Sequence, residues 1–124
     1  MIKIIIADDH EIIRKCFSAL FKMLSDCEII AEASNDKEAI DLAKKHNPDI
    51  ILMDYKMPEL SGIEATQIIK KEMPEIKIIG LSMHNEDSYI QEFLDAGADT
   101  YLLKDCGISE IKRTILEVYN NSNV

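Results

Sequence analysis

The stretch DIILMDYKMP at residues 49–58 decides the fold. It opens with a short apolar run, Ile50 to Met53, and then stops at the carboxylate of Asp54. A run that is apolar on both faces is typical of a central strand in a parallel sheet. An acid at the carboxyl end of such a strand lies where open α/β sheets bind their ligands. We therefore predict a buried strand that leads directly into a functional carboxylate.

Four other runs along the chain also predict strands, and helical patterns alternate with them. The predicted strands are Ile2–Ala7, Glu28–Ala33 (more exposed), Asp49–Met53, Ile76–Leu81 and Asp99–Leu103. The predicted helices span Ile12–Leu24, Asp36–His46, the segment from Ser61 to Pro74, Glu86–Asp95 and Ile108–Tyr119. This alternation with short connections predicts an α/β fold of three layers, a doubly wound (βα)5 domain with a five-stranded parallel sheet.

Several residues predict where the helices begin, end and face the core. The apolar side of the first helix is predicted to comprise Ile12, Ile13, Cys16, Phe17, Leu20, Phe21 and Leu24. Its cap is expected near Asp9 or His10. Ser61 followed by Glu64 has the spacing of a capping box, and Gly97 is placed for a left-handed helix stop. On the fourth helix, Tyr89, Ile90 and Phe93 are interpreted as core residues rather than as an interface.

Composition narrows the class of protein. The chain has 124 residues with 47% hydrophobic and 30% charged side chains, which fits one domain with a proper core. A net charge of -9 disfavours nucleic-acid binding by this segment, since phosphates are bound through Lys and Arg. No apolar run reaches the ~20 residues of a membrane span, and the start of the chain turns acidic too soon for a signal peptide. We expect a cytoplasmic protein without membrane contact.

The cysteines do not suggest a metal site. Cys16, Cys27 and Cys106 are widely spaced and form no Cys-x-x-Cys pair. They are interpreted as small buried or half-buried thiols.

Four predicted strands end in polar groups: Asp8 with Asp9, then Asp54, Ser82 and Lys104. Each group alone is usually a turn former, a helix cap or a solvated lysine. In a parallel sheet, however, all carboxyl ends line one edge, so these groups are expected to meet. Their co-occurrence at four strand ends favours a functional site.

Three carboxylates in one cleft repel one another and must take up a proton, spread apart or bind a cation. Oxygen ligands favour a hard ion, and Mg²⁺ fits because it needs few carboxylates and leaves positions open for phosphate oxygens. Asp54 is then a candidate nucleophile, since carboxylates form acyl phosphates. A hydroxyl at Ser82 and an ammonium at Lys104 would stabilise a transferring phosphoryl group.

Over nearly its whole length, the chain resembles the receiver domain of two-component response regulators. The matching motifs are IADDH at 6–10, DIILMDYKMPELSGIE at 49–64, GLS at 80–82 and GADTYLLKD at 97–105. The phrases DDH, EAS and GADTYLLKD look most like the NarL/FixJ subfamily, whose members usually carry a C-terminal helix-turn-helix domain. The resemblance implies a strand order of 2-1-3-4-5. It also implies that 1–124 is the receiver and that any DNA-binding output domain lies outside this chain.

The resemblance assigns roles to individual residues. Asp54 matches the phosphoacceptor, Asp8 and Asp9 match the pair that holds Mg²⁺, and Lys104 matches the invariant lysine. Asp9 would be the more direct of the two acidic ligands. Three further roles follow: a metal contact through the backbone carbonyl of Lys56, a switch hydroxyl at Ser82, and an aromatic that reorients on activation at Tyr101.

The function implied is a phosphorylation-controlled switch that assists its own modification and is not a metabolic enzyme. A phosphohistidine of a sensor histidine kinase would donate the phosphoryl group to Asp54, and a signalling face would control transcription through the output domain. The first or the last helix could also present a homodimer contact. Two departures from the family pattern stand out. Asp105 stands where many receivers have proline, so no cis proline is expected there. Lys56 brings a positive side chain near the phosphoryl position and, together with His84, is expected to affect phosphoryl lifetime.

Three alternatives remain. A phosphatase of the haloacid-dehalogenase type expects a second Asp two positions after the nucleophile, where this chain has Lys56. A receiver-like interaction module that is never phosphorylated would not need every one of these positions filled. A dinucleotide-binding fold expects glycines after the first strand, where this chain has Asp8-Asp9-His10.

Overall fold

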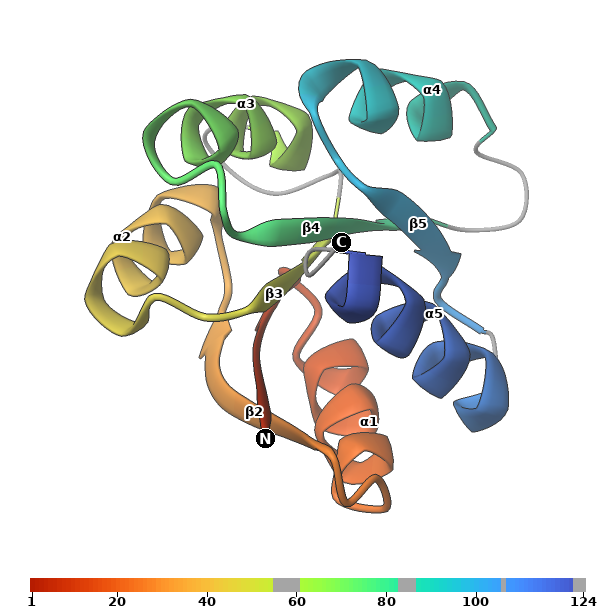
Figure 1. The fold of residues 1–124 in the computed structure, drawn as a ribbon. Coiled ribbons are helices and arrows are strands. Elements are labelled where there is room, and N and C mark those ends of the chain that lie inside the picture. Colours follow the sequence, from red (N-terminus) through yellow and green to blue (C-terminus); the bar gives the residue numbers. More distant parts are fainter. Residues whose placement is uncertain (55–60, 83–86, 106, 122–124) are drawn as a thin grey trace.

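The computed structural model describes residues 1–54, 61–82, 87–105 and 107–121, and it confirms the predicted fold class. Five parallel strands form one sheet in the order β2-β1-β3-β4-β5 (Figure 1). The strands are β1 (Ile2–Ala7), β2 (Cys27–Ala33), β3 (Ile50–Asp54), β4 (Lys77–Ser82) and β5 (Thr100–Leu103). The helices are α1 (Glu11–Phe21), α2 (Asp36–His46), α3 (Gly62–Glu72), α4 (Asp87–Ala96) and α5 (Ile108–Asn121).

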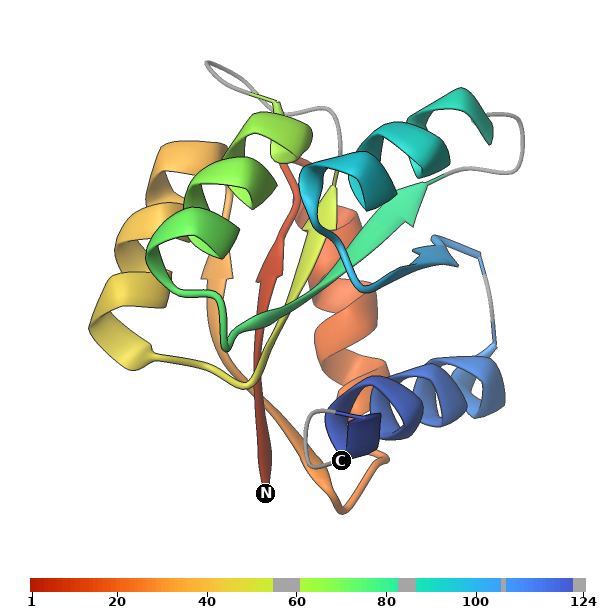
Figure 2. The same cartoon turned by 45° about the horizontal axis from the view of Figure 1, so that its top comes forward.

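Helices cover both faces of the sheet, which explains why the residues of β3 before Asp54 are apolar on both faces. Figures 1 and 2 show α1 and α5 on one face and α2, α3 and α4 on the other. On β3, Ile50 and Leu52 belong to the core on the α1 and α5 side, whereas Ile51 and Met53 belong to the opposite core. All four side chains are fully buried. The strand that precedes Asp54 is therefore a rigid, doubly packed element.

The predicted apolar face of α1 was too wide. Phe17 and Phe21 are buried, but the side chain of Ile12 is 77% exposed and Cys16 is exposed as well. At about 100° per residue, Ile12 and Cys16 lie on a stripe of the helix beside the stripe that carries Phe17 and Phe21. Only the stripe with the two phenylalanines packs against the core. Leu24 is buried, but it lies beyond the end of the helix.

The other burial predictions were partly right. Cys27 is buried as expected, the exposure of Cys16 contradicts the prediction, and Cys106 lies outside the described residues. On α4, Phe93 is fully buried in the core, whereas Tyr89 is 37% exposed.

Two of the predicted helix signals are confirmed. The hydroxyl of Ser61 accepts a hydrogen bond from the Glu64 backbone N–H at 3.1 Å, as an N-cap does. Gly97 has a φ of 114°, which a side chain would strain.

At other helix ends, the sequence pattern did not predict what the structure contains. At α2, the Asn35 side chain accepts from the Glu38 N–H at 2.8 Å, and the Glu38 carboxylate accepts from the Ser34 N–H at 2.8 Å. The same helix ends at Asn47 in the left-handed conformation, with a φ of 46°. His10 precedes α1 without a side-chain cap among the described residues, because the site described below engages its side chain.

Among the residues that the structure describes, no helix combines the length and the apolar character that a membrane crossing requires.

Candidate functional site

The register of the sheet brings the polar strand ends to one edge. Ala7 pairs with Met53, so Asp8 follows β1 at the level where β3 ends in Asp54. Asp54 in turn pairs with Leu81, and Ser82 pairs with Leu103, the residue before Lys104. The Lys104 backbone N–H donates to the Ser82 carbonyl oxygen at 2.8 Å, which extends the ladder by one step. Each of these residues thus follows, or is, the last residue of a strand.

Lys104 connects two buried carboxylates. Its Nζ lies 3.0 Å from Asp8 Oδ2 and 3.0 Å from Asp54 Oδ1. Asp8 is fully buried, Asp54 is 1% exposed, and the lysine side chain is 7% exposed. Burial by itself would lower the pKa of Lys104, but the attraction of Asp54 and the hydrogen bonds to Asp8 and Asp54 outweigh it. The pKa therefore lies above its usual value, and the lysine is held as a cation.

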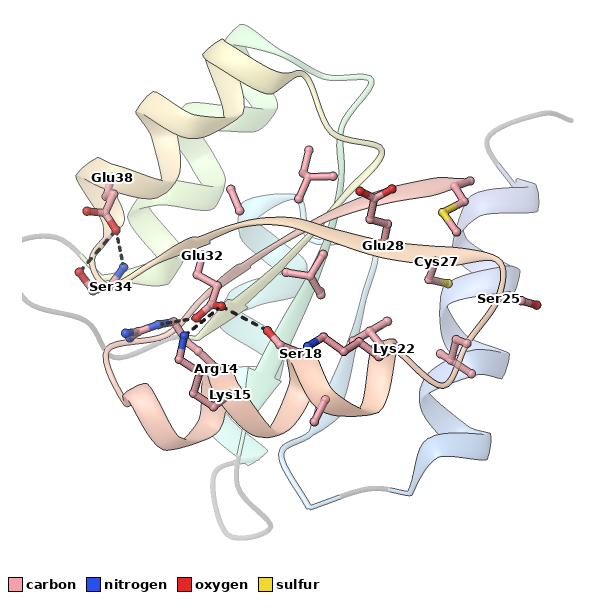
Figure 3. A pocket seen from close by; sticks show the side chains of 17 residues that line it. Arg14, Lys15, Ser18, Lys22, Ser25, Cys27, Glu28, Glu32, Ser34 and Glu38 are labelled. Atoms are coloured by element: carbon pink, nitrogen blue, oxygen red, sulfur yellow. Dashed lines mark hydrogen bonds and ion pairs between the residues drawn. The ribbon is translucent and has the colours of Figure 1, made fainter.

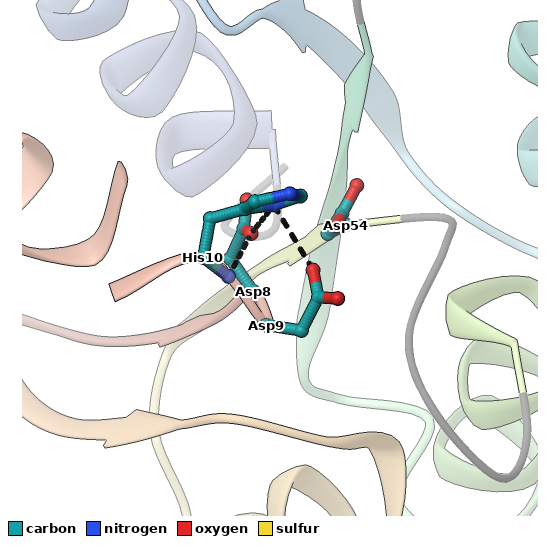
Figure 4. Close-up of side chains that lie close together, drawn as sticks. All are labelled: Asp8, Asp9, His10 and Asp54. Atoms are coloured by element: carbon teal, nitrogen blue, oxygen red, sulfur yellow. Dashed lines mark hydrogen bonds and ion pairs between the residues drawn. The ribbon is translucent and has the colours of Figure 1, made fainter. Parts of the chain in front are cut away.

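Asp9 and His10 complete the cluster on its solvent side. Figure 4 shows the His10 ring turned toward both acids, and its Nδ1 lies 3.0 Å from Asp8 Oδ1 and 3.0 Å from Asp9 Oδ1. The His10 backbone N–H also donates to Asp8 Oδ1 at 2.9 Å. One ligand atom from each of Asp8, Asp9, His10 and Asp54 lies within 4.8 Å of the others. The arrangement could hold a metal ion.

The charges of the cluster suit a divalent cation. Among the described residues, the three carboxylates contribute three negative charges and Lys104 contributes one positive charge, which leaves two negative charges. Such an excess in a largely buried site is unfavourable unless a cation or protons compensate it. Carboxylate oxygens are the ligands that a hard divalent ion prefers.

Behind the cluster, Arg14 of α1 holds the backbone that carries Asp8. Its Nη1 donates to the Asp8 carbonyl oxygen at 2.7 Å, and its Nε donates to Glu32 Oε1 of β2 at 3.2 Å. Lys15 Nζ lies 3.5 Å from Glu32 Oε2, and the Ser18 hydroxyl donates to the same oxygen at 3.3 Å (Figure 3). This network lies in a groove of about 910 Å³ between α1 and β2. Nothing in the sequence pattern predicted it, because α1 and β2 are related only through the folded sheet.

The remaining predicted site residues have distinct environments. Ser82 is fully buried, and its hydroxyl has no hydrogen-bond partner among the described residues. Tyr101 points outward from β5 and is 40% exposed. Lys56, the predicted carbonyl ligand, and His84 lie outside the described residues.

Gly62, at the start of α3, was not singled out by the sequence. A side-chain carbon at this position would overlap the carbonyl oxygen of Asp54. The helix therefore begins directly against the backbone of Asp54, which only a glycine permits.

The strand order and the cluster of acids together define a flavodoxin-like α/β domain with an acidic site at the carboxyl ends of its strands. Residues 4–116 match the family described as the response regulator receiver domain. The chain belongs to this family, and it is a receiver domain of a two-component response regulator.

Curated relatives and solved structures agree with the family. The response regulator protein VraR of Staphylococcus saprophyticus is 39% identical over 99% of this chain and 59% of its own length. The transcriptional regulatory protein LnrK of Bacillus subtilis is 38% identical over 100% of this chain and 56% of its own length. A crystal structure of a DNA-binding response regulator of the LuxR family from Staphylococcus aureus superimposes with a TM-score of 0.88 at 30% identity, covering 96% of this chain and 99% of that one. These similarities support a receiver of the NarL/FixJ type.

The chain spans somewhat more than half the length of the curated relatives it matches, 59% and 56% in the two cases above.

Proposed function

We propose that Asp54 accepts a phosphoryl group from a phosphohistidine of a sensor histidine kinase, in a reaction that requires Mg²⁺. The observation that carries this proposal is the buried Asp54 carboxylate held by Lys104, beside Asp8 and Asp9. An oxygen of Asp54 forms the new bond to phosphorus, and the bond from phosphorus to the imidazole nitrogen of the kinase breaks. The histidine leaves with the electrons of that bond, and water later hydrolyses the acyl phosphate.

Each neighbour of Asp54 has a role in this proposal. Asp8, Asp9 and Asp54, with the backbone carbonyl of Lys56, would hold Mg²⁺, and Asp9 would be the more direct acidic ligand. The ion, when bound, supplies positive charge to the carboxylates and the phosphoryl oxygens. Lys104 lies 3.0 Å from Asp54 Oδ1, so its ammonium can pair with a phosphoryl oxygen attached there.

Ser82 and Tyr101 would transmit the change. The buried Ser82 hydroxyl has no partner among the described residues, so it can donate to a phosphoryl oxygen when one arrives. We propose that Ser82 moves toward the phosphoryl group and thereby leaves space for Tyr101, which is 40% exposed, to turn inward. The face formed by α4, β5 and α5 would then change. The domain acts as a switch that assists its own phosphorylation and dephosphorylation, rather than as a metabolic enzyme.

For the whole protein, we propose a cytoplasmic transcription regulator in which this receiver controls a DNA-binding output domain. The proposal is supported by relatives named as transcriptional regulators and by their greater length. Homodimers formed through a helical face would be one output of the switch.

The test is phosphorylation with Mg²⁺ and acetyl phosphate, followed by intact-mass measurement. We expect one added phosphoryl group in the wild type and none in Asp54→Asn, while Asp41→Asn on the exposed side of α2 behaves like the wild type. Failure to gain mass would favour the alternative, an interaction module that is not phosphorylated. A gain that survives Asp54→Asn would place the phosphoacceptor elsewhere.

A further inference from the structure

The position of His10 goes beyond what an acidic metal site requires. Its Nδ1 lies 3.0 Å from one oxygen of Asp8 and 3.0 Å from one oxygen of Asp9. Its backbone N–H donates to the same Asp8 oxygen at 2.9 Å, so the backbone and the ring of His10 both contact that carboxylate. Figure 4 shows the His10 ring above Asp8 and Asp9, with Asp54 to the right of the ring.

These distances suit neighbouring ligands of one metal ion. Two donors that bind a metal at about 2.1 Å and at right angles lie about 3.0 Å apart. Nδ1 has this separation from each of the two carboxylate oxygens. A proton on Nδ1 can lie along the line to only one of the two oxygens, because a hydrogen bond weakens steeply as it bends. A metal ion can bind His10 Nδ1 and the two carboxylate oxygens at the same time.

The charge balance points the same way. Lys104 already compensates part of the charge of Asp8 and Asp54 from the buried side, through Asp8 Oδ2 and Asp54 Oδ1. The other Asp8 oxygen, Oδ1, faces His10. The two negative charges that remain among the described residues match a divalent ion, and a neutral imidazole adds a donor without changing this balance. The His10 side chain is 64% exposed, so the ring can adjust toward an ion that enters from solvent.

We propose that His10 Nδ1 is a direct metal ligand, which makes this receiver bind nitrogen-preferring divalent ions such as Co²⁺ more tightly than Mg²⁺. This inference rests on the proposed function, because it concerns the metal site that phosphorylation would use. Mg²⁺ prefers oxygen ligands and gains little from imidazole, whereas imidazole suits the later first-row metals. His10 is thus a residue that determines metal specificity.

The test compares Co²⁺ and Mg²⁺ binding to the metal-free 124-residue domain by titration calorimetry, in one buffer at mildly alkaline pH. The variants are His10→Ala, Asp9→Ala and, as a matched control, His46→Ala, which removes an exposed histidine at the end of α2. We expect His10→Ala to lose about tenfold or more in Co²⁺ affinity and to change Mg²⁺ affinity by less than about threefold. The His46→Ala variant should match the wild type for both ions.

A spectroscopic measurement reports the ligand itself. With Mn²⁺ in the site, electron spin-echo spectra of the wild type should show modulation by a directly bound nitrogen, and His10→Ala should lack it. Unchanged Co²⁺ affinity in His10→Ala together with no nitrogen modulation in the wild type would overturn the proposal.

The outcomes separate this inference from the proposed function. If Asp9→Ala abolishes binding of both ions while His10→Ala changes neither, the acidic site stands and His10 is not a ligand. If the wild type binds neither ion, the proposed metal-dependent function fails as well.

Discussion

At the scale of single residues, Lys104 determines the electrostatics of the site. Its ammonium lies 3.0 Å from each of two buried carboxylates. Removing one partner of such a buried group leaves uncompensated charge, which is more costly than losing an exposed ion pair.

Replacing Lys104 by Met should therefore destabilise the metal-free domain by about 3–5 kcal/mol in urea unfolding. Lys44→Met is the matched control, because the Lys44 side chain is 54% exposed and pairs with Glu72 at 3.5 Å. The control should lose less than about 1 kcal/mol. Equal losses in the two variants would mean that Lys104 does not compensate the buried carboxylates.

We also predict that the difference in unfolding free energy between the wild type and Lys104→Met depends on pH. The folded-state pKa of Lys104 is raised above its unfolded value of about 10.4, so the folded state retains its proton at higher pH. The contribution of Lys104 is thus fully present below about pH 10.4 and is lost as the pH rises through the folded pKa. The difference in unfolding free energy between the two proteins should narrow above that pH, and a gap that stays constant would contradict the assignment.

At the scale of elements, two contacts place the strand ends. The first is the overlap that any side chain at Gly62 would have with the Asp54 carbonyl oxygen. The second is the bridge by which Arg14 of α1 connects the end of β1 with Glu32 of β2. Both fix backbone segments, so both should affect the site without touching a phosphoryl group.

Gly62→Ala should destabilise the domain and slow phosphorylation of Asp54, because α3 or the end of β3 must shift to admit the methyl group. We expect a loss of about 1–3 kcal/mol in unfolding free energy. Gly107→Ala is the control, since a side-chain carbon there meets nothing within 4 Å. A Gly62→Ala variant as stable and as reactive as the control would show that the close approach is not needed.

Arg14→Met should weaken Mg²⁺ binding severalfold and lower the unfolding free energy by about 1.5–3 kcal/mol, the range for hydrogen bonds from charged groups. Lys15→Met tests whether the loss of any positive charge near Glu32 weakens Mg²⁺ binding. Lys15 pairs with the same carboxylate as Arg14 but is 64% exposed. Calorimetric Mg²⁺ titration of both variants makes the comparison. Weakening by Lys15→Met to the same degree would indicate a general effect of charge rather than positioning of Asp8.

At the scale of the whole molecule, the alternation of strands and helices was sufficient to predict the layers and the parallel sheet. Once all strands are parallel, Asp8, Asp54, Ser82 and Lys104 must lie at one edge, so their meeting followed from their places in the chain. The exposure of Ile12 was not predicted, because two adjacent stripes of α1 are both apolar and periodicity alone does not choose between them. The bridge from Arg14 to Glu32 depends on how α1 packs against β2, and no local pattern encodes that packing.

The turn that aims His10 at two acids was also beyond sequence reasoning. Asp8-Asp9-His10 reads as a strand end followed by a helix cap, yet the His10 ring engages the carboxylates instead of capping α1. Local propensity is commonly overridden where a site is built.

The central claim, that Asp54 is the phosphoacceptor, is tested most directly by locating the phosphoryl group. After reaction with acetyl phosphate and Mg²⁺, borohydride reduces an aspartyl phosphate to homoserine, and peptide mass spectrometry identifies the altered residue. We predict homoserine at position 54 in the wild type, with no altered residue when Mg²⁺ is omitted. Homoserine at another aspartate, with position 54 intact, would contradict the claim.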